Sequence, residues 1–367
     1  MEGERPHDAL SHDQHRGGRF MPKNGRADRW SLDRKLAGII LIAIGVFLLQ
    51  VVTQAAAGQA ASPSGVVVTK FASVLSESHA MHKSYLFFAD RVKDLTGGKL
   101  IIKVYPNSQL GNEREYIEFL QTGQIEFGRT ATAVLGPFIP QFQVFDLPYL
   151  FKDKQEMFRA ADGELGATLR RLLEEKLNIK GFGFFDDGTR HIYNSKRPIY
   201  TPADLKGMKL RTMENQLMIK TYNAMGAAST PLPFGELYSA LQQGVVDAAE
   251  GPVQSYWAMK HYEISKYWTY TGTFLSSAIP MVGLKWFNAQ PKEFQQAIEQ
   301  AGKELIVKNR QFMGDQEKEA TEDLKQKGVQ FNEVKDKAAF VKLVEPMYKE
   351  YEAKIGKDLI DKARNPK

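Results

Sequence analysis

The segment 226–252, GAASTPLPFGELYSALQQGVVDAAEGP, constrains the fold of this 367-residue chain more than any other stretch. Phe234 and Gly235 interrupt the chain after a proline-flanked extended run. The next residues place apolar side chains at the i, i+3, i+4 spacing of a helix with one buried face, and these are Leu237, Ala240 and Leu241. Gly244 stands where a helix commonly ends in glycine. The segment therefore predicts a strand followed by a helix.

A second strand is predicted directly after this helix, because 245–249 is apolar. Glu250 would then lie at the carboxyl end of a strand, which is where α/β folds place ligand contacts. An ordinary α/β unit with a surface acid would show the same pattern. The pattern alone leaves these two interpretations open.

The chain before this unit alternates strands and helices, as α/β domains do. Strands are predicted at 66–71, 100–105 and 127–134, and helices from about 79 to 95 and at 113–121. Extended segments at 181–186 and 190–194 flank Asp187 and Gly188, a dipeptide typical of turns. A capped helix start at 201–204, TPAD, is followed by Gly207 and an alternating strand at 208–213 that carries Arg211.

The chain turns helical after Pro291 for about 35 residues, with an apolar stripe formed by Phe294, Ile298, Ala301, Leu305 and Phe312. At 1.5 Å per residue such a helix is on the order of 50 Å long, more than one small domain needs. A last helix is predicted from about Lys335 to Lys362.

Four segments resemble the substrate-binding proteins of tripartite ATP-independent periplasmic (TRAP) transporters. They are LGNERE (110–115), FDLPYLF (145–151), RHIYNSKRPIYTPADLKGMKLRTM (190–213) and the segment 226–252. The similarity runs in order from about Val66 to Trp286. It implies an α/β, two-lobe periplasmic binding protein fold with discontinuous lobes, hinge strands and a long helix that spans both lobes.

The resemblance also implies where the chain divides. We expect a signal region at 1–61, a first lobe at 65–187 plus about 277–316, and a second lobe at 188–276 plus about 317–367. The signal region rests on its own pattern, since Arg34 and Lys35 precede an apolar run at 36–52 that small residues follow. Met21 is an alternative start, and an uncleaved membrane anchor is the alternative to a cleaved signal. We expect an exported, periplasmic protein.

Composition narrows the function classes. Residues 1–61 hold 8 of the 49 Lys and Arg and 6 of the 43 Asp and Glu, which leaves 41 and 37, a net charge of +4. Lysines alternate with acids and form no basic patch, so we expect no nucleic-acid binding. The chain has no cysteine, which excludes disulfides, thiolate nucleophiles and a lipidated-cysteine anchor.

Two arginines indicate the ligand class. The planar guanidinium matches a carboxylate with two hydrogen bonds and stays charged at any relevant pH. In the pattern of the resembled family, Arg190 and Arg211 correspond to the carboxylate clamp. A surface ion pair is the ordinary alternative for either arginine.

Other site residues follow from the same resemblance. Phe234 corresponds to an aromatic ring against the ligand, and Glu113 and Thr130 would face the cleft from the first lobe. Glu250 would hold Arg211 or bind the ligand directly. The sequence departs from the family pattern at Gly251, where an asparagine is common, and at Thr273, where a histidine is common. These departures widen the expected ligands from four-carbon dicarboxylates to organic acids such as keto acids, sugar acids and aromatic or branched carboxylates.

Enzymatic interpretations find little support. No HExxH, nucleophile elbow or phosphate loop is present, and Gly181 and Gly183 lack the third glycine of a dinucleotide site. His79 and His82 could share a metal with Glu77, but a surface or helix-cap role is the more ordinary one. We expect no catalysis, no cofactor and no metal.

The sequence thus predicts a solute receptor that delivers a small organic acid to the small and large integral membrane subunits of a transporter. We expect a monomer, with a dimer left open. An exported enzyme or a sensor subunit with the same two-lobe fold is the alternative, because fold does not fix function.

Overall fold

The computed structural model describes residues 65–366. Its strands form one mixed sheet in the order β2-β1-β3-β9-β5-β8-β6-β7, with β4 and β10 also paired to β9. The strands are β1 (Val67–Ala72), β2 (Leu100–Tyr105), β3 (Phe127–Ala131), β4 (Ile179–Gly181), β5 (Phe185–Asn194), β6 (Lys209–Thr212), β7 (Ala228–Pro231), β8 (Ala248–Gly251), β9 (Tyr267–Gly283) and β10 (Gln330–Glu333).

Two long strands connect the two halves of the sheet. β9 is 17 residues long, pairs antiparallel with β3 and β4 through its last residues and pairs with β10 through its first residues. β5 pairs antiparallel with β9 on one side and with β8 on the other. Within each half the neighbouring strands are parallel, β1 with β2 and β3, and β6 with β7 and β8. The predicted fold class, α/β in two lobes joined by hinge strands, is confirmed.

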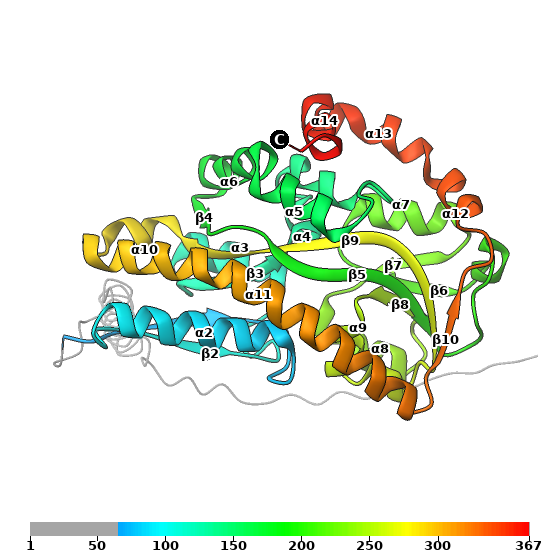
Figure 1. Cartoon of the computed structure of the whole chain (residues 1–367), viewed down its shortest axis with the longest axis horizontal. Helices are drawn as coiled ribbons and strands as arrows, with labels where there is room; N and C mark the ends of the chain where they lie inside the picture. The colour runs from blue at the N-terminus through cyan, green and yellow to red at the C-terminus, as the bar shows by residue number, and fades with distance from the viewer. Residues whose placement is uncertain (1–64, 367) are drawn as a thin grey trace, which may run out of the picture. The chain divides into compact units, whose positions relative to one another are not determined.

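Helices cover the sheet, as Figure 1 shows. They are α2 (Ala80–Leu95), α3 (Glu113–Thr122), α4 (Thr132–Leu135), α5 (Lys154–Asp162), α6 (Glu164–Leu177), α7 (Gln216–Ala224), α8 (Leu237–Gln242), α9 (Val253–Ala258), α10 (Leu284–Ala289), α11 (Lys292–Gln326), α12 (Lys337–Val344), α13 (Pro346–Ile355) and α14 (Lys357–Arg364). Short 3-10 turns are η1 (Pro140–Asp146), η2 (Pro202–Leu205), η3 (Phe234–Glu236) and η4 (His261–Glu263).

The long helix predicted after Pro291 is α11, which has 35 residues. It lies along α2 and also contacts α9 and β5 (Figure 1). Its predicted apolar stripe faces the protein, since Phe294, Ile298, Ala301 and Leu305 are buried and Phe312 is half-buried. One continuous helix therefore packs against α2, α9 and β5, which are far apart in the sequence.

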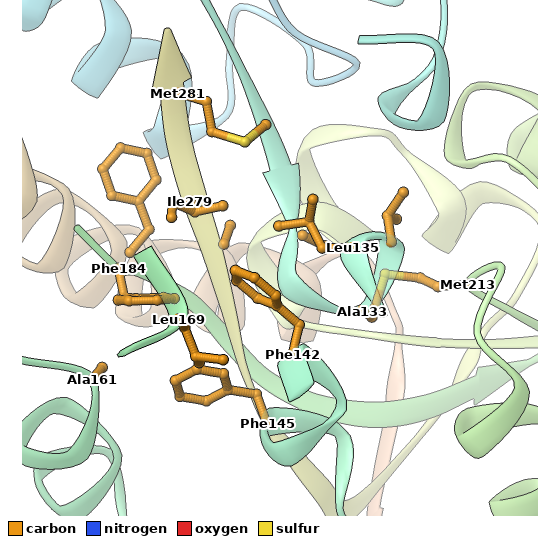
Figure 2. Packing of buried hydrophobic residues seen from close by; sticks show 14 of the residues in the cluster. Ala133, Leu135, Phe142, Phe145, Ala161, Leu169, Phe184, Met213, Ile279 and Met281 are labelled. Carbon is orange, nitrogen blue, oxygen red and sulfur yellow. The ribbon is translucent and has the colours of Figure 1, made fainter. Parts of the chain in front are cut away.

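A core of aromatic and aliphatic side chains holds η1 against β9 and the helices of this region. Phe142 and Phe145 of η1 face Phe184, with ring centres 6.4 and 5.3 Å apart. Leu169 and Ile279 lie in the same group (Figure 2). This packing fixes the backbone of η1, which ends at the buried Asp146.

The structure corrects three predicted boundaries near the site. The strand predicted at 127–134 ends at Ala131, and α4 follows. The turn expected at Asp187 and Gly188 is a bulge within the continuous strand β5, where Gly188 has a φ of +84°. Glycine adopts this conformation without the penalty that a side chain would bring. The strand predicted at 245–249 begins at Ala248, and Val245 is exposed.

The single C-terminal helix predicted over 335–362 is wrong. Three helices, α12, α13 and α14, occupy this stretch. Pro346 begins α13 because proline lacks the amide hydrogen that a helix interior needs, and Gly356, with a φ of +99°, separates α13 from α14. α14 packs on α5 and α6, which belong to the stretch predicted as the first lobe, although α14 itself was assigned to the second.

The predicted signal region 1–61 and the alternative start at Met21 lie outside the described residues. Within residues 65–366, no helix combines the length and the apolar character that a membrane crossing requires. The predicted lobe boundaries stay predictions.

Candidate functional site

A cavity lies between two groups of elements. One group consists of the β1–α2 loop, the β2–α3 loop, β3 and α4. The other consists of the β5 bulge, the end of β6 and the segments around η3 and α9. Half of its wall is apolar, formed by Leu75, Ala131, Val134, Met213, Leu232, Pro233, Phe234 and Pro252. The other half carries polar or charged side chains, those of Asn112, Glu113, Arg129, Asp187, Arg190, Arg211, Glu214 and Ser255. Three guanidinium groups thus share one small space.

Arg129 of β3 is neutralised by two carboxylates. Its Nη1 donates to Glu113 at the start of α3, and its Nη2 donates to Asp187 in the β5 bulge. The Glu113 carboxylate also accepts the backbone N–H of Ala131 at 2.9 Å, and Asp187 accepts the hydroxyl of Ser276 at 3.1 Å. Arg129 therefore stabilises the wall of the cavity, and its positive charge is already balanced by these two carboxylates.

Arg190 of β5 is paired as well. Its Nε donates to the Glu250 carboxylate at the end of β8, and its Nη2 donates to the Glu250 carbonyl at 3.3 Å. A second acid, Asp187, lies 3.7 Å from its Nη1. Burial alone would lower the pKa of Arg190, but Glu250 raises it above its usual value.

Arg211 of β6 differs from the other two. It is 1% exposed, and its Nε donates to the carbonyl of Leu232 at 2.8 Å. No carboxylate of residues 65–366 forms an ion pair with it, and its buried Nη1 has no hydrogen-bond partner there. Burial lowers the pKa of Arg211. The centre of the Phe234 ring lies 5.7 Å from the guanidinium carbon, so the positive charge lies over an aromatic face. This contact does not replace an anionic partner.

The cavity is closed by a contact between η3 and the β2–α3 loop. Gly235 approaches this loop so closely that a Cβ at this position would lie 2.7 Å from Ser108 Oγ and 2.9 Å from Asn112 Oδ1. Both oxygen atoms are buried without a hydrogen-bond partner among the described residues. The segment that carries Phe234 thus packs directly on the segment that leads to Glu113.

Asp146 lies behind the cavity wall, at the end of η1. Its carboxyl accepts a hydrogen bond from Asn215 Nδ2 at 2.8 Å, and the same amide donates to the Ala133 carbonyl at 2.9 Å. Burial raises the pKa of Asp146 to about 8, although the nearby Arg190 opposes this. The Asp146 carboxyl is therefore mostly protonated at neutral pH.

The structure brings together four of the eight predicted site residues. Arg211, Arg190, Phe234 and Glu113 all line the cavity. Glu250 lies behind them and pairs with Arg190, not with Arg211. A direct role of these residues in ligand binding stays a prediction.

The other three predicted residues do not line the cavity. Gly251 lies in β8 beside the ring of Tyr193. Thr130 is buried in β3, and its hydroxyl has no partner among the described residues. Thr273 donates its hydroxyl to Thr271 at 3.0 Å.

Sequence reasoning missed Arg129, Asp187 and Ser255. Arg129 carried a signal, because a charged residue within the small, otherwise uncharged strand FGRTA requires a buried partner. Its partner Asp187 is 58 residues away, so only the fold reveals the pair. The expected cap role of His79 is confirmed, since its side chain accepts the N–H of Met81.

Comparisons with known proteins identify the family of the chain. Residues 71–354 match the family described as bacterial extracellular solute-binding protein, family 7. A solute-binding protein of Verminephrobacter eiseniae is 34% identical over 76% of this chain and 83% of its own length.

Solved structures are similar too. The sugar acid binding protein of Advenella mimigardefordensis, in complex with galactonate, is 29% identical, with a TM-score of 0.80 over 82% of this chain and 97% of that one. A TRAP periplasmic solute-binding protein of Sulfurospirillum deleyianum with bound succinate is 31% identical, with a TM-score of 0.78 over 82% and 99%. The chain therefore belongs to family 7 of the bacterial extracellular solute-binding proteins, which includes the TRAP receptors that its sequence resembles.

Proposed function

We propose that this protein is a periplasmic receptor that captures a small organic acid by its carboxylate and delivers it to the membrane subunits of a TRAP-type transporter. The observation that carries the proposal is Arg211, a buried arginine that lines the cavity without an anionic partner among residues 65–366. A buried charge is costly unless it is paired. A carboxylate in the cavity supplies the missing pair.

The chemistry of the guanidinium group supports a carboxylate in particular. Arginine offers parallel N–H donors in a planar fork that matches the two oxygens of a carboxylate. The Phe234 ring beside Arg211 covers an apolar part of a bound molecule, together with Leu232 and Met213. The ligand is therefore a small acid that binds with one charged end and one face against apolar side chains.

The remaining polar groups favour an organic acid with hydroxyl or keto oxygens. Arg129 and Arg190 are already paired with Glu113, Asp187 and Glu250, so a second carboxylate finds no further unpaired cation among the described residues that line the cavity. Hydroxyl groups can donate to acceptors in the wall, such as Asn112 Oδ1, whose hydrogen-bonding capacity is unused within residues 65–366. The galactonate of the relative from Advenella mimigardefordensis is an acid of this class.

Binding at this site requires a closed cleft. Glu113 and Arg129 belong to the stretch predicted as the first lobe, and Arg190, Arg211 and Phe234 belong to the second. A ligand that contacts both groups favours the closed arrangement, by the hinge type of ligand-driven change. The closed form is then the signal that the membrane subunits recognise. Residues 1–61 direct export, so the receptor acts in the periplasm.

A panel of carboxylates tests the proposal. The protein without residues 1–61 is screened by thermal shift with galactonate, gluconate, galacturonate, succinate and pantoate, and with neutral galactose as the matched control. An acid at 100 times its dissociation constant adds about 2.7 kcal/mol of stability. We expect at least one acid, and not galactose, to raise the melting temperature. Stabilisation by galactose alone, or by no acid of an extended panel, contradicts the proposal.

A further inference from the structure

Ser255 lines the cavity from α9, and a residue outside the cavity wall holds its hydroxyl. The Nε2 atom of His79, the residue before α2, lies 3.1 Å from Ser255 Oγ. Both residues are buried, with His79 fully inaccessible and Ser255 7% exposed. The two side chains join segments that are 176 residues apart.

The hydrogen bonds of His79 fix which ring nitrogen carries the proton. Its Nδ1 accepts the backbone N–H of Met81 at 3.1 Å. An amide N–H can only donate, so Nδ1 is unprotonated. Burial, assisted by the charge of Arg129, lowers the pKa of His79 to about 3 and keeps the ring neutral. Nε2 therefore carries the hydrogen and donates it to Ser255 Oγ.

This assignment fixes the direction of the Ser255 hydroxyl. An oxygen that accepts from Nε2 turns its own hydrogen elsewhere. Within residues 65–366, Ser255 Oγ forms no hydrogen bond other than the one that it accepts from this ring. Because Ser255 is part of the cavity wall, its free hydrogen is available to a molecule in the cavity.

The Ser255 hydroxyl and the Arg211 guanidinium group are separate binding groups of the cavity. Ser255 belongs to α9 and is hydrogen-bonded to His79, whereas Arg211 belongs to β6 and lies beside Phe234. The cavity therefore offers a cation at one place and a directed neutral donor at another. An acid with one carboxylate and a further oxygen satisfies both.

We propose that Ser255, oriented by His79, donates a hydrogen bond to a hydroxyl or keto oxygen of the bound acid and thereby sets the specificity of the receptor. This inference rests on the proposed function and adds a residue that recognises the uncharged part of the ligand. His79 is a positioning residue, because it acts through Ser255. Selectivity for oxygenated acids over their deoxy counterparts follows.

A structural role of the same contact must be separated from recognition. Ser76 Oγ and Ser78 Oγ also reach across to α9, at 3.3 and 3.4 Å from the carbonyl of Ala258. The His79 contact could thus merely hold α9 against α2. A variant of Ser78, which does not line the cavity, provides the matched control.

The test is calorimetric titration of wild type, Ser255→Ala, Ser78→Ala, His79→Asn and the Ser255→Ala/His79→Asn double variant. The probes are galactonate, erythronate and their monodeoxy analogues, each of which lacks one hydroxyl. Asparagine at position 79 keeps an acceptor for the Met81 N–H but is too short to reach Ser255. Circular dichroism and melting temperature verify that each variant is folded.

We expect Ser255→Ala to weaken binding of the parent acid by about 2- to 10-fold, the effect of one neutral hydrogen bond. The loss should disappear for one monodeoxy analogue. His79→Asn should cause a similar loss, and Ser255→Ala should add little to it. Ser78→Ala should show no dependence on the analogue.

Two results would overturn the inference. If Ser255→Ala binds the parent acid as tightly as wild type does, Ser255 does not donate a hydrogen bond to the ligand. If Ser255→Ala weakens binding of the parent acid and of every analogue equally, Ser255 only holds the two lobes together. Failure of wild type to bind any of these acids, or any acid of the thermal-shift panel, contradicts the proposed function as a whole. The two failures are therefore distinguishable.

Discussion

The guanidinium of Arg211 lies 5.7 Å from the ring centre of Phe234, in a cavity where the neighbouring arginine is already paired with a carboxylate. Burial lowers the pKa of Arg211, whereas Glu250 raises the pKa of Arg190. The two arginines were predicted to form one clamp. In the structure they are in different electrostatic states, and of these two arginines only Arg211 has a buried N–H group without a hydrogen-bond partner within residues 65–366.

Replacement of Arg211 should remove ligand binding. Arg211→Ala deletes one partner of a desolvated charge pair, which typically costs about 2–5 kcal/mol of binding free energy. Arg211→Lys keeps the charge but loses the planar fork, so we expect at least about a tenfold weaker affinity. Calorimetry with the tightest acid of the panel measures both. A lysine variant within threefold of wild type would mean that the site recognises charge without bidentate geometry.

Arg190→Ala should act first on stability. Its removal leaves the buried Glu250 carboxylate unpaired, and breaking a buried pair in this way costs about 3–5 kcal/mol. The double variant Arg190→Met with Glu250→Gln removes both charges and should recover much of that loss. Chemical denaturation of the ligand-free protein measures the difference. An Arg190→Ala variant as stable as wild type would argue against this pair as it is described.

Gly235→Ala should hinder closure of the cleft. A methyl group at this position would lie 2.7 Å from Ser108 Oγ and 2.9 Å from Asn112 Oδ1, so these side chains, or the segments that carry them, must shift. We expect weaker binding and a smaller ligand-induced decrease in radius of gyration by small-angle scattering. Gly314→Ala is the matched control, because no atom of the part of the chain that the structure describes lies within 4 Å of its Cβ position. If both variants close like wild type, η3 does not limit closure.

Asp146→Asn should increase stability, and the increase should grow with pH. The pKa of Asp146 is about 8 in the folded protein, against 3.8 for an ordinary aspartate, so the folded protein holds a proton that the unfolded chain releases. The contribution of Asp146 to stability is fully present below about pH 4 and is lost as pH rises to 8. The stability difference between variant and wild type should therefore grow by about 1.4 kcal/mol per pH unit between pH 5 and 8. Denaturation midpoints at pH 5, 6.5 and 8 measure it, and a constant difference would contradict the raised pKa.

Much of the fold was predictable because its signals are local. The 35 residues of α11, the cap at His79 and the start of α3 at Glu113 each follow from periodicity or from a single terminal residue. The exceptions are Pro346 and Gly356, which divide the stretch predicted as the last helix. Proline and a glycine with positive φ end helices whatever the apolar pattern suggests.

The site was predictable only in part, because its polar pairs join distant segments. Arg190 and Arg211 were found through a family resemblance, but their different partners depend on how β5, β6 and β8 align in the sheet. Nothing in the sequence near Ser255 indicates His79, and nothing near Arg129 indicates Asp187. The hydrophobic periodicity of a single strand or helix does not show which side chains from distant segments form ion pairs or hydrogen bonds.

Direct calorimetric titration of the protein without residues 1–61, with galactonate and with the best acid of the panel, tests the central claim. We predict saturable binding at one molecule per chain, no chemical change in the recovered acid, and loss of that binding in Arg211→Ala. Binding of the acid with equal affinity to wild type and to a folded Arg211→Ala variant would contradict the claim that the unpaired guanidinium of this cavity holds the ligand.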